Sequence, residues 1–422
     1  MIKKSFLLKI FNAACMQRWN DKLRPIELTE MDKQAHKMMI AYILGNLEEK
    51  KGNEVNWIRI IEGGIYEYML RAALTDIKPP VFHNIKNHTS EYYKMIDWAY
   101  KVWEPLIGNL EERFTVEKDF CDYHKQKQGN RDRDILEVAH ILATHWEYDY
   151  LLAQFNQIDY EKKTITARHR KDSNYCKGKG LHYGKDLEKL VTFCGQLRFQ
   201  VRWAHLHRVP RTSVLGHLLF VAIIIYIISL ELGKEADKQK YCDKRLYNNF
   251  FTGLFHDLPE ALTRDIISPV KKTGIDKIIK KLEASEMDKK ILKYLPDDAW
   301  KDEIRLFTGI LKDSNGKKLS EFSNVYLTEG IYMSLPSDDM TNFNEDSYKR
   351  RDGRIVEAAD HLAAFIEAFV AIENGCSSKD LHEALYKLKS EFDITTSKKK
   401  TFLPKGYDST ISILMHEIYS EF

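Results

Sequence analysis

The chain has 422 residues, of which 30% are charged and 44% hydrophobic, a composition typical of a globular protein with a buried core. At roughly 150 residues per domain, this length indicates two or three domains. Lysine and arginine number 65, and aspartate and glutamate 62. The resulting net charge of +3 excludes a general polyanion binder, so no nucleic acid partner is expected. The six cysteines are scattered without a Cys-x-x-Cys, which excludes a disulfide scaffold and a zinc ribbon and favours a cytoplasmic protein.

Two apolar segments raise the question of secretion or a membrane. The N-terminal stretch MIKKSFLLKIF resembles a signal peptide, but Lys9 interrupts it, so a cytoplasmic protein is expected and secretion is the alternative. Residues 212–230 contain no aspartate, glutamate, lysine or arginine, although His217 lies near their start. The fully apolar part, residues 218–228, has only 11 residues, which is short for a bilayer. A helix buried in a large core is therefore predicted, and a membrane span is the alternative.

Helical spacing dominates the rest of the chain. Apolar residues recur at helical intervals over residues 136–146 and 355–369, whereas strand-like alternation is scarce. The fold class predicted is therefore all-α. Residues 171–185 combine three glycines with many lysines and predict a linker. Residues 314–351 are polar and irregular and predict a long loop or insertion.

The chain also repeats itself, because three pairs of landmarks recur in the same order. They are Arg18-Trp19 followed by His36 and Arg202-Trp203 followed by His217, residues 70–86 and 253–271, and residues 135–143 and 355–363. His36 follows Trp19 by 17 residues and His217 follows Trp203 by 14. These matches predict two copies of one helical domain, at about 1–175 and 187–422; a chance likeness between helices is the alternative.

Four residues of the second copy form a candidate metal site. His217, His256, Asp257 and Asp360 each lie in an apolar helical stretch, where an unpaired charge would be costly. Two imidazoles and two carboxylates suit one divalent ion, and Mn, Co, Fe, Ni, Zn and Mg remain open. Pro259 predicts a break between two helices, which would direct His256, Asp257 and Glu260 into one cleft.

These residues resemble the H…HD…D signature of the HD superfamily of metal-dependent phosphohydrolases. The similarity is greatest to the bacterial HD-domain 5'-deoxynucleotidases, which have an Arg-Trp pair 14 residues before the first histidine, as Arg202-Trp203 does here. Their pattern HDxxExLTxDxxxPVK is matched by HDLPEALTRDIISPVK, residues 256–271. The resemblance covers residues 187–400 well and residues 1–160 weakly.

The resemblance implies an all-helical fold, one divalent ion on the four ligands, and hydrolysis of a nucleoside monophosphate to nucleoside and phosphate. Glu260 and Asp265 would orient water or move a proton. Lys271 would hold phosphate charge. Arg202 would contact the nucleotide, and Trp203 would pack against its sugar or base.

Several features depart from the family pattern. Gly216 stands where the family has an acid, and Asp360 follows Asp257 by 103 residues, which places an insertion around residues 301–351. The HD motif lacks the additional residues typical of cyclic-nucleotide phosphodiesterases and (p)ppGpp hydrolases. The alternatives are a dNTP triphosphohydrolase, a phosphodiesterase, or a nucleotide-sensing protein without catalysis.

The first copy has lost most of this chemistry. Alignment places Thr75, Asp76, Pro79 and His140 opposite His256, Asp257, Glu260 and Asp360. A degenerate, catalytically inactive HD-like domain is predicted, and a residual site of His36, Asp76 and His140 is the alternative. Because related nucleotidases often form dimers, the two copies are expected to pack as an internal pseudo-dimer, with further homo-oligomerisation left open.

Overall fold

The computed structural model describes residues 2–107, 116–126, 129–155, 159–235, 240–264, 266, 274–336, 342–392 and 407–420. The chain forms two units. Unit 1 comprises Met1–Phe11, Leu106–Phe114 and Gln196–Phe422, and unit 2 comprises Asn12–Pro105 and Thr115–Gly195. The described residues of both units are mostly helical, as predicted, and the named strands belong to one small sheet in unit 1.

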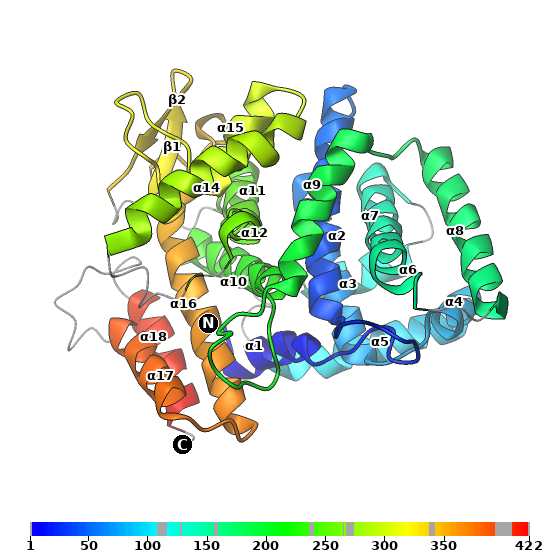
Figure 1. Cartoon of the computed structure of the whole chain (residues 1–422). Coiled ribbons are helices and arrows are strands. Elements are labelled where there is room, and N and C mark those ends of the chain that lie inside the picture. The colour runs from blue at the N-terminus through cyan, green and yellow to red at the C-terminus, as the bar shows by residue number, and fades with distance from the viewer. Residues whose placement is uncertain are drawn as a thin grey trace. The chain divides into compact units, whose positions relative to one another are not determined.

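Three helices form the centre of unit 1: α10 (Val214–Glu235), α11 (Asp243–Phe255) and α16 (Gly353–Glu373). Figure 1 shows α11 and α16 beside α10. The stretch Val214–Leu232 is apolar and long enough to cross a membrane, but it is entirely buried. A helix that is apolar on every side needs neighbours all round, so the prediction of a buried core helix is confirmed.

A glycine allows α11 to approach α10 closely. A Cβ at Gly253 would lie 2.5 Å from Ile225 Cδ1 and 2.9 Å from Ala222 Cα. Any larger residue would push the two helices apart, and His256 follows Gly253 by less than one turn. The glycine therefore sets the distance between the two helices that carry His217 and His256.

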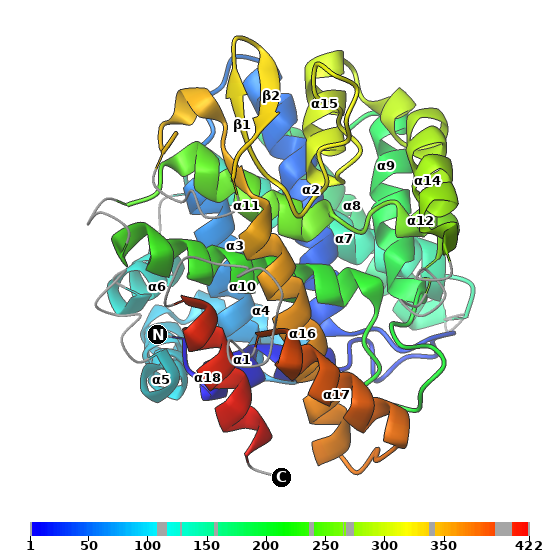
Figure 2. The ribbon, with the colours of Figure 1, turned by 90° about the vertical axis from the view of Figure 1, so that its left-hand side faces the viewer.

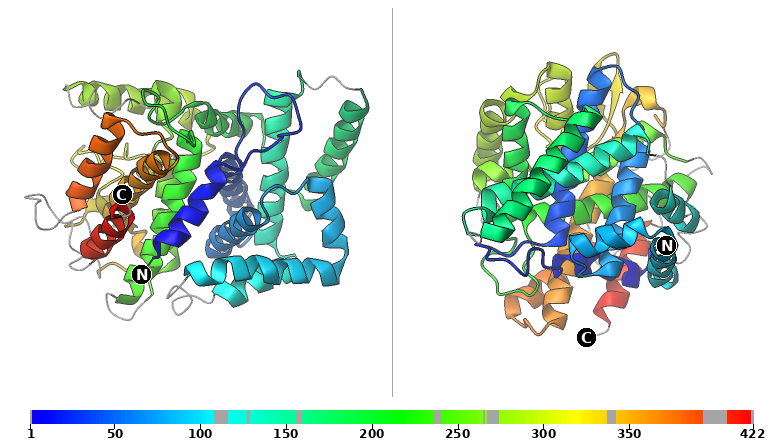
Figure 3. Two further views of the ribbon diagram at one scale, coloured as in Figure 1. Left: turned by 90° about the horizontal axis from the view of Figure 1, so that it is seen from below. Right: turned by 90° about the vertical axis from the view of Figure 1, so that its right-hand side faces the viewer.

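Short elements surround this centre. α17 (Lys379–Phe392) and α18 (Tyr407–Tyr419) pack on α16 (Figure 2). The first helix, α1 (Lys4–Phe11), contacts α10 (Figure 3, left). The rings of Phe11 and Phe220 lie 5.3 Å apart at this contact. The remaining named helices of unit 1 are η4 (Leu197–Phe199), α12 (Glu260–Thr263), α14 (Asp276–Lys290), η6 (Leu292–Tyr294), α15 (Asp298–Phe307) and η7 (Asp346–Tyr348).

The region predicted as a long loop, residues 314–351, instead contains strands. β1 (Asn324–Thr328) pairs antiparallel with β2 (Ile331–Ser334) and β3 (Arg351–Asp352), in the order β2-β1-β3. Glu329 and Gly330, with φ of 49° and 77°, form the tight turn between β1 and β2. The strands are so short that polar flanking sequence hides them from a periodicity search.

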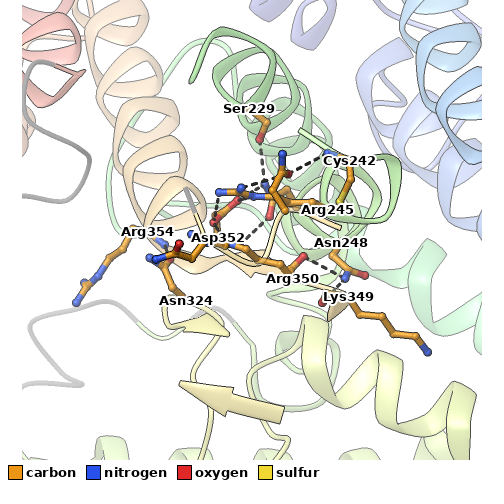
Figure 4. Close-up of polar contacts among 12 residues, drawn as sticks. Ser229, Cys242, Arg245, Asn248, Asn324, Lys349, Arg350, Asp352 and Arg354 are labelled. Atoms are coloured by element: carbon orange, nitrogen blue, oxygen red, sulfur yellow. Dashed lines mark hydrogen bonds and ion pairs between the residues drawn. The ribbon is translucent and has the colours of Figure 1, made fainter. Parts of the chain in front are cut away.

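A buried charge cluster attaches this sheet to the central helices (Figure 4). Asp352, the N-cap of α16, accepts hydrogen bonds from Arg245 of α11, Nε to Oδ2 over 2.6 Å and Nη2 to Oδ1 over 2.9 Å. Arg350 Nε donates to the same carboxylate over 2.9 Å. Burial alone would raise the pKa of Asp352, but Arg245 and Arg350 outweigh it and hold that pKa well below its usual range.

Unit 2 is built around α2 (Glu30–Lys50), α3 (Trp57–Leu74) and α7 (Arg131–Glu147). The helix predicted over residues 136–146 lies within α7 and is confirmed. The other named helices are η1 (Asn12–Ala14), α4 (Pro79–Asn87), α5 (Thr89–Ile107), α6 (Val116–Lys125), η3 (Tyr148–Leu152), α8 (Asp159–Lys179) and α9 (Lys185–Gln196).

The predicted linker, residues 171–185, is mostly helical. α8 continues to Lys179, where Arg131 Nη1 donates to the Lys179 carbonyl over 2.7 Å and Lys179 Nζ pairs with Asp134. Gly180, with φ of 65°, then ends the helix. The end of α8 is thus bound to α7 through Lys179, and only residues 180–184 of the predicted linker lie outside a helix.

The Asp352 cluster yields a stability prediction. Asp352→Asn should lower the free energy of unfolding by about 3–5 kcal/mol at neutral pH, because two buried guanidinium groups lose their carboxylate. The pKa of Asp352 is lower in the folded chain than the ~3.9 of an unfolded one, so this stabilisation is complete above about pH 5 and declines as the pH falls. Urea unfolding at several pH values measures it.

Asp298→Asn is the matched control, because the exposed carboxylate of Asp298 pairs with Lys301 at the surface. The control should unfold like the wild type. A gap between wild type and Asp352→Asn that stays constant down to pH 2 would contradict the assignment.

Candidate functional site

The four predicted ligands come from three elements of unit 1. His217 lies in the first turn of α10, and Asp360 lies on α16. His256 and Asp257 follow α11 directly, and α12 begins at Glu260 with Pro259 as its N-cap. The predicted helix break is therefore present, and Pro259 lies one position before the first helical residue.

The structure brings these side chains together. His217, His256 and Asp257 each offer a ligand atom, and the three atoms lie within 4.8 Å of one another. Asp360 Oδ1 lies 2.8 Å from His217 Nε2. His217 and His256 are almost fully buried, at 1% and 4% exposed. The two buried imidazoles and the partly exposed Asp257 thus converge, and Asp360, also partly exposed, joins this group through its contact with His217.

The donor atoms fit a metal ion. His256 Nδ1 contacts the Gly253 carbonyl over 2.9 Å, which turns Nε2 toward the cluster. That Nε2 atom is buried and makes no hydrogen bond within the described part of the chain, although Asp257 Oδ2 lies 3.4 Å away. A buried polar atom without a hydrogen bond is costly, and coordination to a divalent ion would remove this cost.

Glu367, which sequence reasoning did not assign to the site, contacts His217 on the side away from the other candidate ligands. This fully buried carboxylate lies 3.1 Å from His217 Nδ1 through Oε1. Its Oε2 accepts hydrogen bonds from Trp203 Nε1 over 2.9 Å and from Arg202 Nε over 3.2 Å. A proton on Nδ1 of His217, donated to Glu367, leaves the Nε2 lone pair facing the cluster.

The charges of this network reinforce one another. Burial would raise the pKa of Glu367, but Arg202 and His217 hold it well below its usual range. Burial and Arg202 act to lower the pKa of His217, yet Glu367 and Asp360 raise it. A sequence signal for Glu367 does exist, since it lies two helical turns after Asp360 on the same buried face of α16.

Of the other predicted site residues, the structure describes Arg202, Trp203 and Glu260. Arg202 Nη1 lies 4.0 Å from Asp257 Oδ2, and Glu260 is 6% exposed at the start of α12. The indole N–H of Trp203 donates a hydrogen bond to Glu367, so Trp203 helps to fix the carboxylate behind His217. Asp265 and Lys271 lie outside the described residues.

The insertion reaches this site. The ring of Phe322, which precedes β1, lies 6.5 Å from that of His256, centroid to centroid. The carbonyls of Ser320 and Ser323, on either side of Phe322, accept hydrogen bonds from the buried Arg351. Phe322 is thus held beside a predicted ligand by a fixed loop.

Unit 2 contains the same support without the same ligands. Arg18 Nε and Trp19 Nε1 donate to Glu147 Oε2 over 3.1 and 2.9 Å. Lys33 Nζ contacts His140 Nδ1.

The predicted pairing of His36 with His217 differs from what the structure has. His36 Nε2 contacts the Val191 carbonyl over 2.9 Å and its ring packs edge-on against Trp146. Asp76 is exposed and accepts a hydrogen bond from Asn20. Within the described ranges, His217, His256 and Asp257 form a group whose ligand atoms lie close enough to share one ion, and His36, Asp76 and His140 do not.

Comparison with known proteins agrees with this geometry. Residues 194–394 match the family model of the HD domain, a range that contains His217, His256, Asp257 and Asp360. No curated protein matches the chain. The match supports membership of the HD superfamily of metal-dependent phosphohydrolases, whose domains bind divalent metal ions.

Proposed function

We propose that the chain is a metal-dependent phosphohydrolase that removes the 5'-phosphate of nucleoside or deoxynucleoside monophosphates. The observation that carries this proposal is the buried group of His217, His256 and Asp257, with ligand atoms within 4.8 Å of one another inside the HD domain match. Such a group has the donor types that a hard or borderline divalent ion prefers.

His217, His256, Asp257 and Asp360 would hold one divalent ion. Bound there, the ion would neutralise phosphoryl oxygens and lower the pKa of a coordinated water. Glu367 keeps His217 in the tautomer that presents Nε2, and the Gly253 carbonyl does the same for His256. The imidazoles are thus oriented before any ion or substrate arrives.

Glu260 is the group we assign to proton transfer. It follows Asp257 by three residues, and its backbone carbonyl is fixed by Gln200 Nε2 over 2.7 Å. A carboxyl group held at the edge of the site can take a proton from the attacking water and return it to the leaving oxygen. Arg202, 4.0 Å from Asp257, would supply positive charge for the phosphate.

A nucleotide is the proposed substrate because residues 256–271 follow the nucleotidase pattern. Phe322 beside His256 would give a sugar or base an aromatic surface. Release of inorganic phosphate from a panel of nucleoside mono-, di- and triphosphates, with Mn²⁺ or Co²⁺ added, tests the proposal. Phosphate from monophosphates supports it; triphosphate release from dNTPs, or binding without release, would replace it.

We further propose that the two units are copies of one domain, packed as an internal pseudo-dimer. Support comes from the Arg-Trp-Glu contacts that recur in both units. Further support comes from the helix that precedes each Arg-Trp pair, because each belongs to the other unit. α1 precedes Arg18-Trp19 and belongs to unit 1, whereas α9 precedes Arg202-Trp203 and belongs to unit 2 except for its last residue. Exchange of equivalent helices is common between paired copies of a domain.

The metal site yields a binding prediction. The chain should bind one divalent ion, and Asp257→Ala should abolish stoichiometric binding, because the group of three loses the carboxylate that Asp257 supplies. Metal content after dialysis, measured by elemental analysis, is the readout. Asp243→Ala, at the start of α11, is the control and should keep the ion. One ion per chain persisting in Asp257→Ala would refute the assignment.

The proton-transfer role yields a kinetic prediction. Glu260→Gln should keep the fold and the metal but lower kcat by about 10²-fold or more, as expected when a general acid-base group is lost. Steady-state phosphate release measures this effect. Glu373→Gln, exposed at the end of α16, should retain full activity. Unchanged turnover in Glu260→Gln would assign proton transfer to another group.

The pseudo-dimer yields a coupling prediction. Leu136→Ala, fully buried in α7, should destabilise unit 2 by about 2–5 kcal/mol. If the units pack together, it should also lower the urea concentration at which unit 1 releases its metal. Leu23→Ala, exposed in unit 2, should have no effect. Metal release at the wild-type urea concentration in a destabilised Leu136→Ala would support independent units.

A further inference from the structure

Lys33 in unit 2 occupies the position that corresponds to His217 in unit 1. Lys33 follows Trp19 by 14 residues, as His217 follows Trp203. The helix starts agree, since Thr29 Oγ1 accepts from the backbone N–H three residues later, and Ser213 Oγ does the same. Isolated bridges Gln17↔Thr29 and Val201↔Ser213 fix the same register.

The helices that carry the contacting partners, α7 in unit 2 and α16 in unit 1, also correspond in register. His140 precedes Glu147 by seven residues on α7, and Asp360 precedes Glu367 by seven on α16. Lys33 Nζ contacts His140 Nδ1, just as His217 Nε2 contacts Asp360 Oδ1. Two independent lines, the helix register and the side-chain contact, therefore relate the Lys33–His140 pair to the His217–Asp360 pair.

The charges at corresponding positions differ in one respect. The unit 1 set has two carboxylates and two neutral imidazoles, a net charge that a divalent ion balances. The unit 2 set is Lys33, Thr75, Asp76 and His140, which offers one carboxylate where unit 1 offers two. A lysine also occupies the position of the first histidine ligand, and Asp76 is exposed and accepts a hydrogen bond from Asn20.

Further acids accommodate the buried lysine. Lys33 is fully buried, and an unpaired ammonium there would be costly. Burial lowers the pKa of Lys33 well below its ordinary value, and Glu30 acts in the opposite direction. Glu30 also pairs with Arg18 over 2.8 Å, and Glu67 pairs with the next buried lysine, Lys37, over 2.9 Å.

We propose that unit 2 is an HD-type site in which the amino group of Lys33 occupies the place of the metal ion and contacts His140, so unit 2 binds no metal. This inference rests on the two-copy interpretation and not on the proposed reaction. It implies that unit 2 folds without a metal ion. It also predicts that placing the unit 1 residues at the corresponding positions of unit 2 creates a metal site.

One backbone difference guides the experiment. Thr75 has φ of 55°, whereas His256, at the same place after its helix, has φ of −57°. A histidine at position 75 can therefore point differently from His256. Two variants of the full chain are needed: Lys33→His/His140→Asp, which changes only the pair in contact, and the same with Thr75→His.

Metal content measured by elemental analysis, with Co²⁺ titration followed in the visible spectrum, gives the result. The triple variant should bind one more ion per chain than its parent, and the double variant should bind that ion about 10- to 100-fold more weakly. Thermal unfolding followed by circular dichroism verifies that each variant is folded.

Lys37→His/His140→Asp is the matched control, because Lys37 is equally buried one turn along α2. It should gain no ion. Folded double and triple variants that both keep the metal content of the parent would overturn the proposal. Because the readout is an increase over the parent, it is independent of whether unit 1 binds metal or hydrolyses nucleotides.

Discussion

The carboxylate of Glu367 is the contact on which the candidate site depends. It is completely buried, and it joins His217 of α10 to Arg202 and Trp203 of the preceding loop. A buried acid is tolerable only when donors surround it, and here the donors are residues that the site itself requires. Loss of this acid would remove the carboxylate that Arg202 and Trp203 contact and would leave His217 free to take the other tautomer, so the packing of this loop and the orientation of a candidate ligand depend on the same group.

The insertion is attached with comparable rigidity. Arg245 of α11 and Arg350 converge on Asp352, and Arg351 donates to the carbonyls around Phe322. Three fully buried arginines within one short region require fixed acceptors, because each unsatisfied guanidinium would be expensive. Phe322 therefore lies beside His256 in a loop whose backbone is held by Arg351.

Much of the site can be predicted from sequence because metal ligands are unusual residues in apolar helices. His217 and Asp360 stand out for this reason, and Pro259 marks the helix break beside His256. Glu367 is harder to assign, because its role lies in contacts with residues more than 160 positions away. The short strands and the helical course of residues 171–179 escape prediction because tertiary contacts, such as Lys179 with Asp134, override local composition.

If the two units are copies of one domain, as we propose, Lys33 corresponds to His217 better than His36 does. An alignment that matches identical residues pairs His36 with His217. An alignment by helix register pairs Lys33 with His217, because each follows its Arg-Trp pair by the same number of residues. The register is enforced by backbone hydrogen bonds and by Glu147 and Glu367, which make the same contacts in both units. What the units share is thus the support behind the ligands, which needs no ion. On the proposed two-copy interpretation, this shared support explains how one unit could carry a lysine where the other carries a candidate metal ligand and still keep the same helices.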